Sequence, residues 1–358
     1  MNKVVKIILI SFGSLIGVTV LAIGSFLAFA SATELKVSDI EKLQVDGNVT
    51  TKIDSSVDHS ILSWNIGYGA LDENMDCHLD GGRQVYGSSY DKVIENINAI
   101  TTDIKNINPD MFLLQEIDID SRRSYNTNQR NMFINSFSQD QYNNTLALNF
   151  QAGFIPIPIY SPMGKVISGI STFSKYQVSY AERRQLPIPF SWPMTLFNLK
   201  RCLLINRIPI EGSEKELILV NLHLEAYDDG EGKAKQLKVL MDYLYEERNK
   251  GNYVIAGGDF NQTFREEYFS LYPKRNDWVC PVIDITQYPE FSFLMDETVP
   301  TCRSLNVPYS TLDKLKHQYY MLDGFIVSDN ITVNSVQTID KDFKNTDHNP
   351  VLMNFKLN

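Results

Sequence analysis

The sequence predicts one large α/β (α+β) domain over residues 59–358, preceded by an N-terminal transmembrane helix. Two observations predict this fold class. From His59 onward, short apolar runs of strand length alternate with amphipathic helical stretches. No internal repeat or low-complexity tract occurs, and no Pro/Gly/Ser-rich break splits the chain, so we expect one domain rather than two.

The N-terminal segment has the length and composition of a membrane helix. No charged residue occurs from Ile7 to Thr33, and a membrane helix needs only roughly 20 apolar residues. Lys3 and Lys6 favour a cytoplasmic N-terminus, which places the rest of the chain outside the cell membrane. Small-x-small patterns near residue 30 favour the alternative, a cleaved signal peptide and a secreted protein. Because the apolar run is longer than is usual in a signal peptide, we expect residues 1–33 to stay as a single-pass anchor and residues 34–58 to be a juxtamembrane linker whose end is a candidate first edge strand.

The composition is that of a globular protein with ample material for a core, since 43% of the 358 residues are hydrophobic and 21% are charged. The net charge of −10 is a poor match for a nucleic-acid backbone, which binding proteins meet with Lys and Arg. A metal ion that supplies positive charge locally would still allow a phosphate substrate. The four cysteines have no CxxC or zinc-like spacing, so we expect buried or free thiols, with a Cys280–Cys302 disulfide as the alternative.

The first two predicted strands each end in a polar residue. Residues 61–67 form a strand that contains Asn65 near its end, and an amide oxygen there suits a hard cation. A helix over 90–106 follows, and residues 111–114 then form a buried strand. Glu116 comes directly after it, at the sheet rim where α/β sites lie. The alternatives are a turn role for Asn65 and a solvated loop charge for Glu116.

Residues 118–130 form a polar loop that contains Arg122 and Arg123, either a phosphate-contacting loop or a solvated charged face. Two later segments, 150–162 and 186–197, are rich in proline and aromatic residues and almost uncharged. Such segments pack against the core, line a substrate groove or lie on a membrane surface near the anchor. The sequence also predicts a helix over 131–138 and a strand over 168–174.

Residues 203–210 and 217–224 are two apolar runs joined by a Gly-Ser-Glu-Lys turn, which predicts a β-hairpin. Asn221 and His223 share one face of the second run because side chains two residues apart in a strand point the same way. A lone histidine in a strand is usually structural, but here it accompanies an asparagine at a strand end. Residues 233–248 follow as an amphipathic helix.

The stretch 253–262, YVIAGGDFNQ, predicts a buried strand that breaks at Gly257-Gly258, where the backbone can approach something closely. Asp259 and Asn261 follow two residues apart. The carboxylate can take a proton or face a metal, and the amide can donate to a phosphate oxygen. The alternative is a polar turn after a core strand.

The C-terminal part contains two further candidates. Asp323 lies inside the apolar run 319–327, where an aspartate is unfavourable unless it is paired or functional. The pair Asp347-His348 precedes a last strand over 351–355. Residues 266–301 are expected to be an irregular insert.

In their order along the chain, these motifs resemble the endonuclease/exonuclease/phosphatase superfamily, the DNase I-like family. The resemblance is carried by SWNIGYG, LLQEID, NLHL, GGDFNQ, MLDGF and TDHNP, and it covers nearly all of the chain from Ile61 onward. It implies a four-layer α/β sandwich, in which two packed, mostly antiparallel sheets carry helices outside and the site at one edge. The last motif begins with Thr346 where serine is usual, and the substrate-reading loops match no subfamily.

The resemblance implies a metal site and substrate contacts. Glu116 would be the principal ligand of Mg²⁺ or Mn²⁺, with Asn65 and Asp347 nearby, in the oxygen-rich environment that hard cations prefer. Asn221 of the NLHL motif is expected to contact the substrate, and so are Arg122 and Arg123, which are candidates from the composition of their loop and not from the resemblance.

The resemblance also implies catalytic roles. His348 would be the general base that activates water, oriented by Asp323 through its other ring nitrogen. Asp259 would position the nucleophile or handle a proton, and the family leaves open which of Asp259 and His348 is the base. Asn261 and His223 would stabilise charge in the transition state.

The residues and the resemblance together predict a Mg²⁺-dependent phosphoester hydrolase outside the cytoplasmic membrane, which cleaves by metal-assisted in-line attack of water on phosphate. The anchor, the acidic charge and the apolar segments favour a sphingomyelinase-like lipid phosphodiesterase. Family frequency favours a DNase-like endonuclease, and a small phosphomonoester is a third possibility. A non-catalytic binding protein on the same fold is a remote alternative, since His348, Glu116 and Asp259 are all present. No protein partner is indicated.

Overall fold

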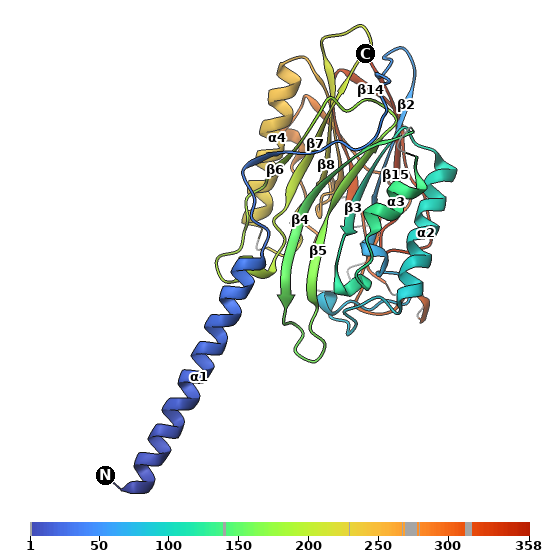
Figure 1. Cartoon of the computed structure of the whole chain (residues 1–358). Coiled ribbons are helices and arrows are strands. Elements are labelled where there is room, and N and C mark those ends of the chain that lie inside the picture. The colour runs from blue at the N-terminus through green and yellow to red at the C-terminus, as the bar shows by residue number, and fades with distance from the viewer. Residues whose placement is uncertain are drawn as a thin grey trace.

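Two β-sheets packed face to face form the centre of this computed structural model, and helices cover both outer faces (Figure 1). The structure describes residues 2–138, 141–228, 230–266, 268, 278, 280–311 and 317–358. Within these residues one sheet has seven strands in the order β1-β6-β7-β8-β9-β13-β10, and the other has six in the order β14-β15-β2-β3-β5-β4. The predicted four-layer α/β sandwich is confirmed.

The strands of the seven-stranded sheet are β1 (Ile40–Lys42), β6 (Tyr180–Gln185), β7 (Cys202–Pro209), β8 (Glu216–His223), β9 (Tyr253–Asp259), β13 (Asp323–Ser328) and β10 (Phe291–Leu294). Those of the six-stranded sheet are β14 (Ile331–Thr338), β15 (Val351–Leu357), β2 (His59–Asn65), β3 (Met111–Asp118), β5 (Gly164–Ser174) and β4 (Asn143–Ile155). The short strands β11 (Cys302–Arg303) and β12 (Tyr319–Tyr320) pair separately.

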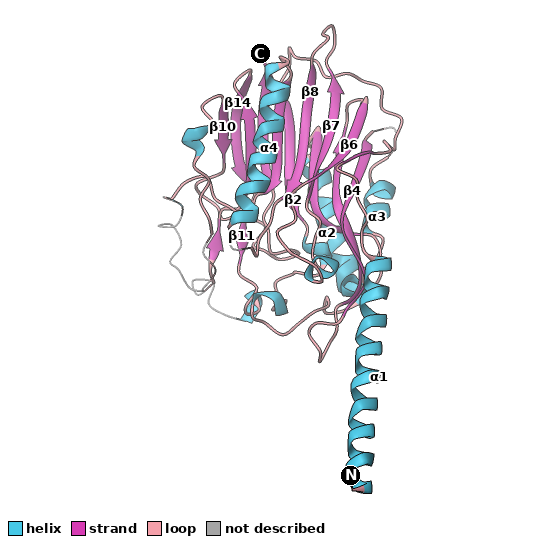
Figure 2. Ribbon diagram, turned by 90° about the vertical axis from the view of Figure 1, so that its left-hand side faces the viewer, coloured by secondary structure: helices cyan, strands magenta, loops and turns pink. Residues whose placement is uncertain are grey.

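Each sheet contains a parallel pair, β2 with β3 and β8 with β9, among otherwise antiparallel neighbours. Parallel neighbours need a crossover connection, and here each crossover contains a helix. The helix α2 (Tyr90–Ile107) connects β2 to β3, and α4 (Glu231–Asn249) connects β8 to β9. Figure 2 shows α4 lying across the outer face of its sheet. Helix α3 (Gln129–Ser136) lies on the same side as α2.

The helices cover the sheets with the apolar stripes that the sequence predicts. In α2 the side chains of Ile97, Ile100 and Ile104 are buried against Trp64 and Phe112 of the six-stranded sheet. The helix begins after Ser89, whose side chain caps Lys92 N, and ends before Asn108, whose left-handed backbone (φ 54°) stops it. This packing fixes α2, and with it the two parallel strands that the helix connects.

Alternation along β8 sets which residues face the other sheet. Leu217 and Leu219 belong to the core between the sheets, whereas Ile218 and Val220 pack outward under α4. Asn221 and His223 therefore continue the inward face of β8. The inward faces turn from apolar to polar at the C-terminal ends of these strands.

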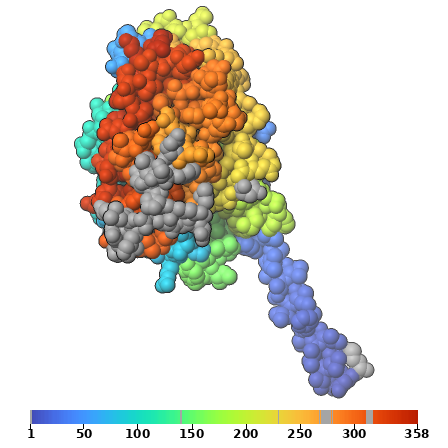
Figure 3. Space-filling view, turned by 180° about the vertical axis from the view of Figure 1, so that it is seen from behind, coloured from blue at the N-terminus to red at the C-terminus, as the bar shows by residue number. Residues whose placement is uncertain are grey.

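Helix α1 (Lys3–Thr33) projects from the domain as a single rod (Figure 3). Its length and the mean hydropathy of 2.4 over an 18-residue window make it a candidate membrane span, and no residue of that window is buried. A mean hydropathy this high on an exposed surface is typical of a helix that lies in lipid or is removed as a signal.

Residues 34–58, expected to be a linker, pack along the domain instead. Strand β1 adds to the edge of the seven-stranded sheet by pairing with β6, and Ile53 is fully buried and bridges to Ile210. Side chains hold the segment as well, since Leu43 and Val45 pack against the core between the sheets and Asp46 pairs with Arg130.

Other elements differ in their bounds. Strand β3 continues past Glu116 to Asp118, and the run 319–327 is divided into β12 and β13, so that Asp323 begins a strand. The first part of the segment 150–162 belongs to β4. Much of the predicted insert 266–301 is described and irregular, but residues 267, 269–277 and 279 lie outside the described residues.

Candidate functional site

The polar ends of four strands meet at one edge of the sandwich. The register of the seven-stranded sheet places His223 of β8 beside Asp259 of β9, and Asp259 beside Asp323 of β13. Because β13 runs antiparallel to β9, its first residue lies level with the last residue of β9. Asn65, the last residue of β2, faces this group from the other sheet, where its Nδ2 donates to Asp259 Oδ2 at 3.1 Å.

His348 lies in the loop before β15, and both its ring and its backbone are hydrogen-bonded. Its Nδ1 lies 2.8 Å from Asp323 Oδ2, and its backbone carbonyl accepts a hydrogen bond from Trp64 Nε1 at 2.9 Å. With Nδ1 engaged by a carboxylate, Nε2 is the nitrogen available to a ligand. Burial alone lowers the pKa of His348, but the charges of Asp323 and Asp347 outweigh it and raise the pKa well above its ordinary value. The dyad therefore stabilises a proton on His348.

Asp259 lies between the two histidines. Its Oδ2 is 3.4 Å from His223 Nε2 and 3.8 Å from His348 Nε2, and its Oδ1 accepts the backbone N–H of Asn261 at 2.9 Å. Burial and the charge of Asp323 raise the pKa of Asp259 to about 7. The 3.8 Å separation is too long for a direct hydrogen bond, so one ligand oxygen can contact both groups.

His223 and Asn261 supply neutral polar groups beside Asp259. Burial and the positive charges of Arg201 and His348 lower the pKa of His223 well below its ordinary value, so its ring stays neutral. Asn261 adopts a left-handed backbone (φ 50°), and its Nδ2 donates to Leu224 O at 2.9 Å. Both side chains border the same cavity as Asp259.

Gly257 and Gly258 bring strands together rather than a ligand. A Cβ at Gly258 would lie 2.0 Å from Leu222 O, and one at Gly257 would lie 2.6 Å from the ring of Phe325. These contacts are too short for any side chain, so both glycines are needed for close strand packing directly before Asp259.

Glu116 reaches the site through a β-bulge in β3. The pairing of β3 with β5 shifts between Leu114 and Ile117, and Glu116 has a left-handed backbone with φ 57°. A bulge of this kind re-aims one side chain, which explains why Glu116 faces the site from within a strand. Burial and the charge of Asp347 raise the pKa of Glu116.

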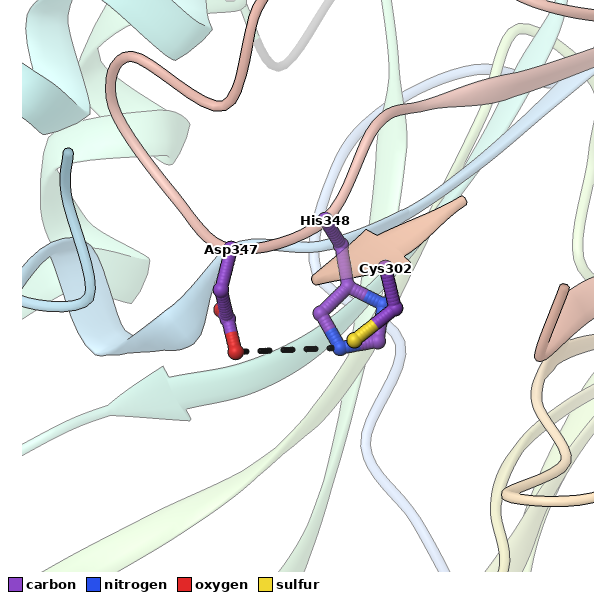
Figure 4. A group of neighbouring side chains, drawn as sticks. All are labelled: Cys302, Asp347 and His348. Carbon is purple, nitrogen blue, oxygen red and sulfur yellow. Dashed lines mark ion pairs between the residues drawn. The ribbon is translucent and has the colours of Figure 1, made fainter. Parts of the chain in front are cut away.

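A cavity of about 610 Å³ contains these groups. Glu116, Asp259, Asp347 and His348 line it, and the pKa of each of the three carboxyls is raised, first by burial. Carboxylates that raise one another's pKa provide a site that a cation would stabilise. The donor atoms of Cys302, Asp347 and His348 also lie within 4.8 Å of one another (Figure 4). The residues therefore fit a divalent cation.

Asn65 is turned differently from the expected metal ligand. Its Oδ1 accepts the backbone N–H of Gly67 at 3.1 Å, while its Nδ2 donates to Glu116 Oε1 at 3.3 Å as well as to Asp259. The amide nitrogen thus faces the carboxylates, and Asn65 positions these two side chains instead of presenting an oxygen. The hydrogen bond from the Gly67 amide fixes this orientation of the amide group.

Asn221 does not border the cavity. It is fully buried between the sheets, where its Nδ2 donates to Ser171 O at 2.9 Å and its Oδ1 accepts from Gln115 Nε2 at 2.8 Å. The expected substrate contact is therefore replaced by a structural one. Asn221 and His223 do share a face of β8, but only His223 is close enough to the edge to reach the cavity.

Of the two predicted arginines, only Arg123 borders the cavity. Arg123 lines the cavity, forms a two-point ion pair with buried Asp118 at 2.9 and 3.1 Å, and stacks 3.7 Å from the centre of the Tyr68 ring. Arg122 is exposed, packs over Tyr86 and does not border the cavity. Adjacent residues in this loop point in opposite directions, which composition does not predict.

Two cavity residues, Arg201 and Arg303, were not singled out by the sequence. Both are buried, and the Nε of each has no hydrogen-bond partner among the described residues. Arg201 pairs loosely with Glu225 (3.7 Å), and Arg303 donates to Asp72 O at 2.7 Å. In the sequence each of them is only an arginine next to a cysteine, which is too common to be informative. The four cysteines are buried and unpaired, as expected.

Comparison with protein families gives a match over residues 62–339 to the model of the Endonuclease/Exonuclease/phosphatase family. The fold is similar to an endonuclease/exonuclease/phosphatase from Beutenbergia cavernae, with a TM-score of 0.58 at 15% identity, covering 84% of this chain and 72% of that one. It is also similar to ANGEL2, a 2',3'-cyclic phosphatase, with a TM-score of 0.53 at 15% identity over 88% and 98% of the two chains. The human Nocturnin catalytic domain with bound sulfate is similar as well, with a TM-score of 0.51 at 14% identity, covering 88% of this chain and 97% of that one. Comparison with the curated proteins found no match in sequence.

Proposed function

This chain belongs to the Endonuclease/Exonuclease/phosphatase family, and we propose that it is a divalent-metal-dependent phosphoester hydrolase that acts outside the cytoplasmic membrane. The observation that carries the proposal is the convergence of a His–Asp dyad, a carboxyl with a pKa of about 7 and two further carboxylates in one cavity. Hydrolysis of a phosphoester needs a base for water and positive charge for the phosphoryl oxygens, and this cavity offers both.

Glu116 and Asp347 are the proposed ligands of Mg²⁺ or Mn²⁺, since both present carboxylate oxygens to the cavity. A bound divalent cation would offset the negative charge on the phosphoryl oxygens and on the leaving group. Asn65 would orient Glu116 through its Nδ2, and Thr346 Oγ1 donates to Asp347 Oδ1 at 3.3 Å. The hydroxyl that Thr346 shares with serine thus supports the second carboxylate.

His348 would take the proton of the attacking water at Nε2. Asp323 on Nδ1 fixes the tautomer and stabilises the imidazolium that forms. The raised pKa of His348 belongs to the metal-free site; a cation at Glu116 and Asp347 would lower it, so that Nε2 is free to accept the proton. Asp259, 3.8 Å from that Nε2, would hold the water in line with the phosphorus. The P–O bond to the leaving group breaks as the water oxygen bonds to phosphorus, and the leaving oxygen takes a proton from the solvent or from the dyad.

Charge on the transition state would be stabilised by donors around the phosphate. Neutral His223 can donate from Nε2, and Asn261 borders the same space. Arg123, Arg201 and Arg303 line the cavity beside its carboxyls, so guanidinium groups are available there although the net charge of the chain is −10. Guanidinium groups suit phosphate oxygens, which supports an anionic substrate.

Localisation follows from α1 in this proposal. Lys3 and Lys6 before the apolar helix support a cytoplasmic N-terminus and an external catalytic domain. Cleavage after the apolar run would instead release the domain.

The test is a screen of phosphoesters with the full chain in detergent, comparing a small phosphodiester, a phosphomonoester, plasmid DNA and phospholipid vesicles. We expect hydrolysis of at least one substrate with Mg²⁺ or Mn²⁺, loss of it with a chelator, and loss of it in His348→Ala. If no phosphoester is cleaved with either metal, or if the chelator and His348→Ala change nothing, the proposal is wrong.

A further inference from the structure

Large apolar side chains are exposed in two uncharged segments, 150–162 at the end of β4 and in its connection to β5, and 186–197 in the loop between β6 and β7. In the first, Ile159 is 91% exposed, and in the second, Trp192 is 63% exposed. No charged residue occurs in 150–162 or 186–197. The segments also expose Phe154, Ile157, Tyr160, Ile188 and Met194. Together these side chains form what we call the apolar face.

The apolar face adjoins the domain end of α1. The ring of Phe26 in α1 stacks on Phe197 at 5.8 Å and meets Phe154 edge-on at 6.4 Å. Thr33 Oγ1 accepts the backbone N–H of Gly153 at 3.2 Å. Figure 1 shows the β4–β5 connection beside the end of the helix. These contacts fix the direction in which α1 leaves the domain.

The length of α1 places these contacts at the membrane surface. At ~1.5 Å per residue the 31-residue helix is about 46 Å long, whereas a hydrocarbon core is about 30 Å thick. If the core begins after Lys6, roughly 20 residues bring the chain to its other side near Phe26. The aromatic contacts of Phe26 with Phe154 and Phe197 would then lie in the interfacial layer, where aromatic side chains are favourable.

The cavity opens at the same end of the molecule. Tyr160 of the apolar face lies 3.2 Å from His78 Nδ1 through its hydroxyl, and the neighbouring Leu79 lines the cavity and is exposed. Leu199, which also lines the cavity, packs in one cluster with Phe197. Exposed Tyr227 lies on the cavity wall as well. The apolar face therefore reaches from α1 to the cavity mouth.

We propose that the apolar face rests on the bilayer that α1 crosses and holds the cavity mouth over the lipid headgroups, so that the substrate is a phosphoester in a membrane-lipid headgroup. This inference rests on the proposed hydrolase function and on α1 spanning the membrane. Burial of isoleucine, tryptophan and methionine side chains in the membrane interface is favourable. The two segments contain no Lys or Arg that would bind the phosphates of a nucleic-acid backbone. The cavity arginines then meet the phosphate of a headgroup from above.

The experiment uses the full chain reconstituted in vesicles of phosphatidylcholine, sphingomyelin and phosphatidylglycerol, with Mg²⁺. Release of headgroup or phosphate from the vesicles is compared with hydrolysis of soluble bis(p-nitrophenyl) phosphate. The variant Ile159→Ser/Trp192→Ser should lower vesicle hydrolysis at least about tenfold, because two side chains no longer enter the interface, and should leave the soluble reaction unchanged. Val57→Ser, at an exposed site before the start of β2 and so at the other end of the strand from the cavity, is the matched control and should change neither rate.

A second measurement does not depend on turnover. Brominated phosphatidylcholine should quench part of the tryptophan fluorescence of the wild-type chain, and Trp192→Phe should remove that part. Cleavage of the soluble diester without cleavage of any vesicle lipid, or equal loss of both reactions in the double variant, would overturn the inference and leave the hydrolase proposal standing. An absence of quenching by the brominated lipid would also overturn it. Absence of all hydrolysis would instead contradict the proposed function.

Discussion

Two polar layers lie next to each other on the inward face of β8, and they differ in charge. At Asn221 the layer is neutral, and that amide exchanges hydrogen bonds with Gln115 and Ser171 across the two sheets. Two residues further, at His223, the layer contains Glu116, Asp259, Asp323 and His348. There His223 Nδ1 and Asp323 Oδ1 have no hydrogen-bond partner among the described residues.

The difference shows how position along one strand separates stability from chemistry. Amides keep one protonation state, so a buried amide layer can fasten two sheets together without depending on pH or on a ligand. In the charged layer, burial raises the pKa values of the carboxyls, which means that their charged forms are unfavourable. Binding of a cation or of a proton removes this cost. Substitutions in the charged layer should change activity most, and substitutions in the amide layer should change stability.

The largest effect is expected for His348→Ala. Loss of a general base lowers kcat/KM by ~10²–10⁴-fold, and the fold should persist because Trp64 donates to the backbone of residue 348 rather than to its side chain. Steady-state kinetics on the substrate found in the screen measure the loss in kcat/KM, and thermal unfolding shows whether the fold persists. A loss smaller than about tenfold in a folded variant would contradict the assignment of the base.

Metal binding should be the next most sensitive property. A chelator should abolish turnover, and Glu116→Gln should raise the Mg²⁺ or Mn²⁺ concentration needed for half-maximal activity by at least ~10–100-fold, since even residues that only support a ligand have effects of this size. A metal titration of the initial rate measures this. Glu246→Gln, on the exposed side of α4, is the control and should leave the titration unchanged. An unchanged titration in Glu116→Gln would exclude Glu116 as a ligand.

Asn221→Ala tests the amide layer. It removes hydrogen bonds to Gln115 and Ser171 and should lower the free energy of unfolding by about 1–3 kcal/mol, because buried partners are left unsatisfied. Denaturant unfolding in detergent measures the change, and kcat/KM of the folded protein should stay as in the wild type. If stability is retained while activity falls, Asn221 acts on the substrate after all.

The smallest expected effect is on how the free energy of unfolding depends on pH. The pKa of His223 is lowered in the folded chain, so below the ordinary histidine value of ~6.5 the unfolded chain binds a proton that the folded chain does not. Stability should therefore fall as pH falls below that value, by up to ~1.4 kcal/mol per pH unit from this group. The wild type and His223→Gln should differ in the slope of unfolding free energy against pH, measured without metal between pH 7 and 5 (roughly the range in which histidine titrates). Parallel slopes would show that His223 is not held neutral.

Sequence patterns predicted the fold elements where apolar periodicity is strong, as in α2, α4 and the hairpin of β7 and β8. They missed β6 and β14, whose residues are mostly polar, because these strands are held by backbone pairing, β6 between β1 and β7 and β14 at the sheet edge against β15, and not by an apolar run of their own. In residues 34–58 the candidate edge strand was placed at the end of a linker, whereas β1 lies earlier, as an exposed three-residue strand at Ile40–Lys42. A strand that is held by backbone pairing alone shows no hydrophobic periodicity in its sequence.

By itself the sequence determined the family, the chemical types at the site and the strand ends that carry them, because alternation and turn residues are local properties of the chain. Only the tertiary structure decided which of these side chains meet. It placed Glu116, His223, Asp259 and His348 around one cavity and left Asn221 and Arg122 outside it. It also turned Asn65 toward Gly67 and brought Arg201 and Arg303 into the cavity. Such choices depend on register, on a bulge at Glu116 and on the crossing of two sheets, and these join residues too far apart in the chain for any local pattern to record.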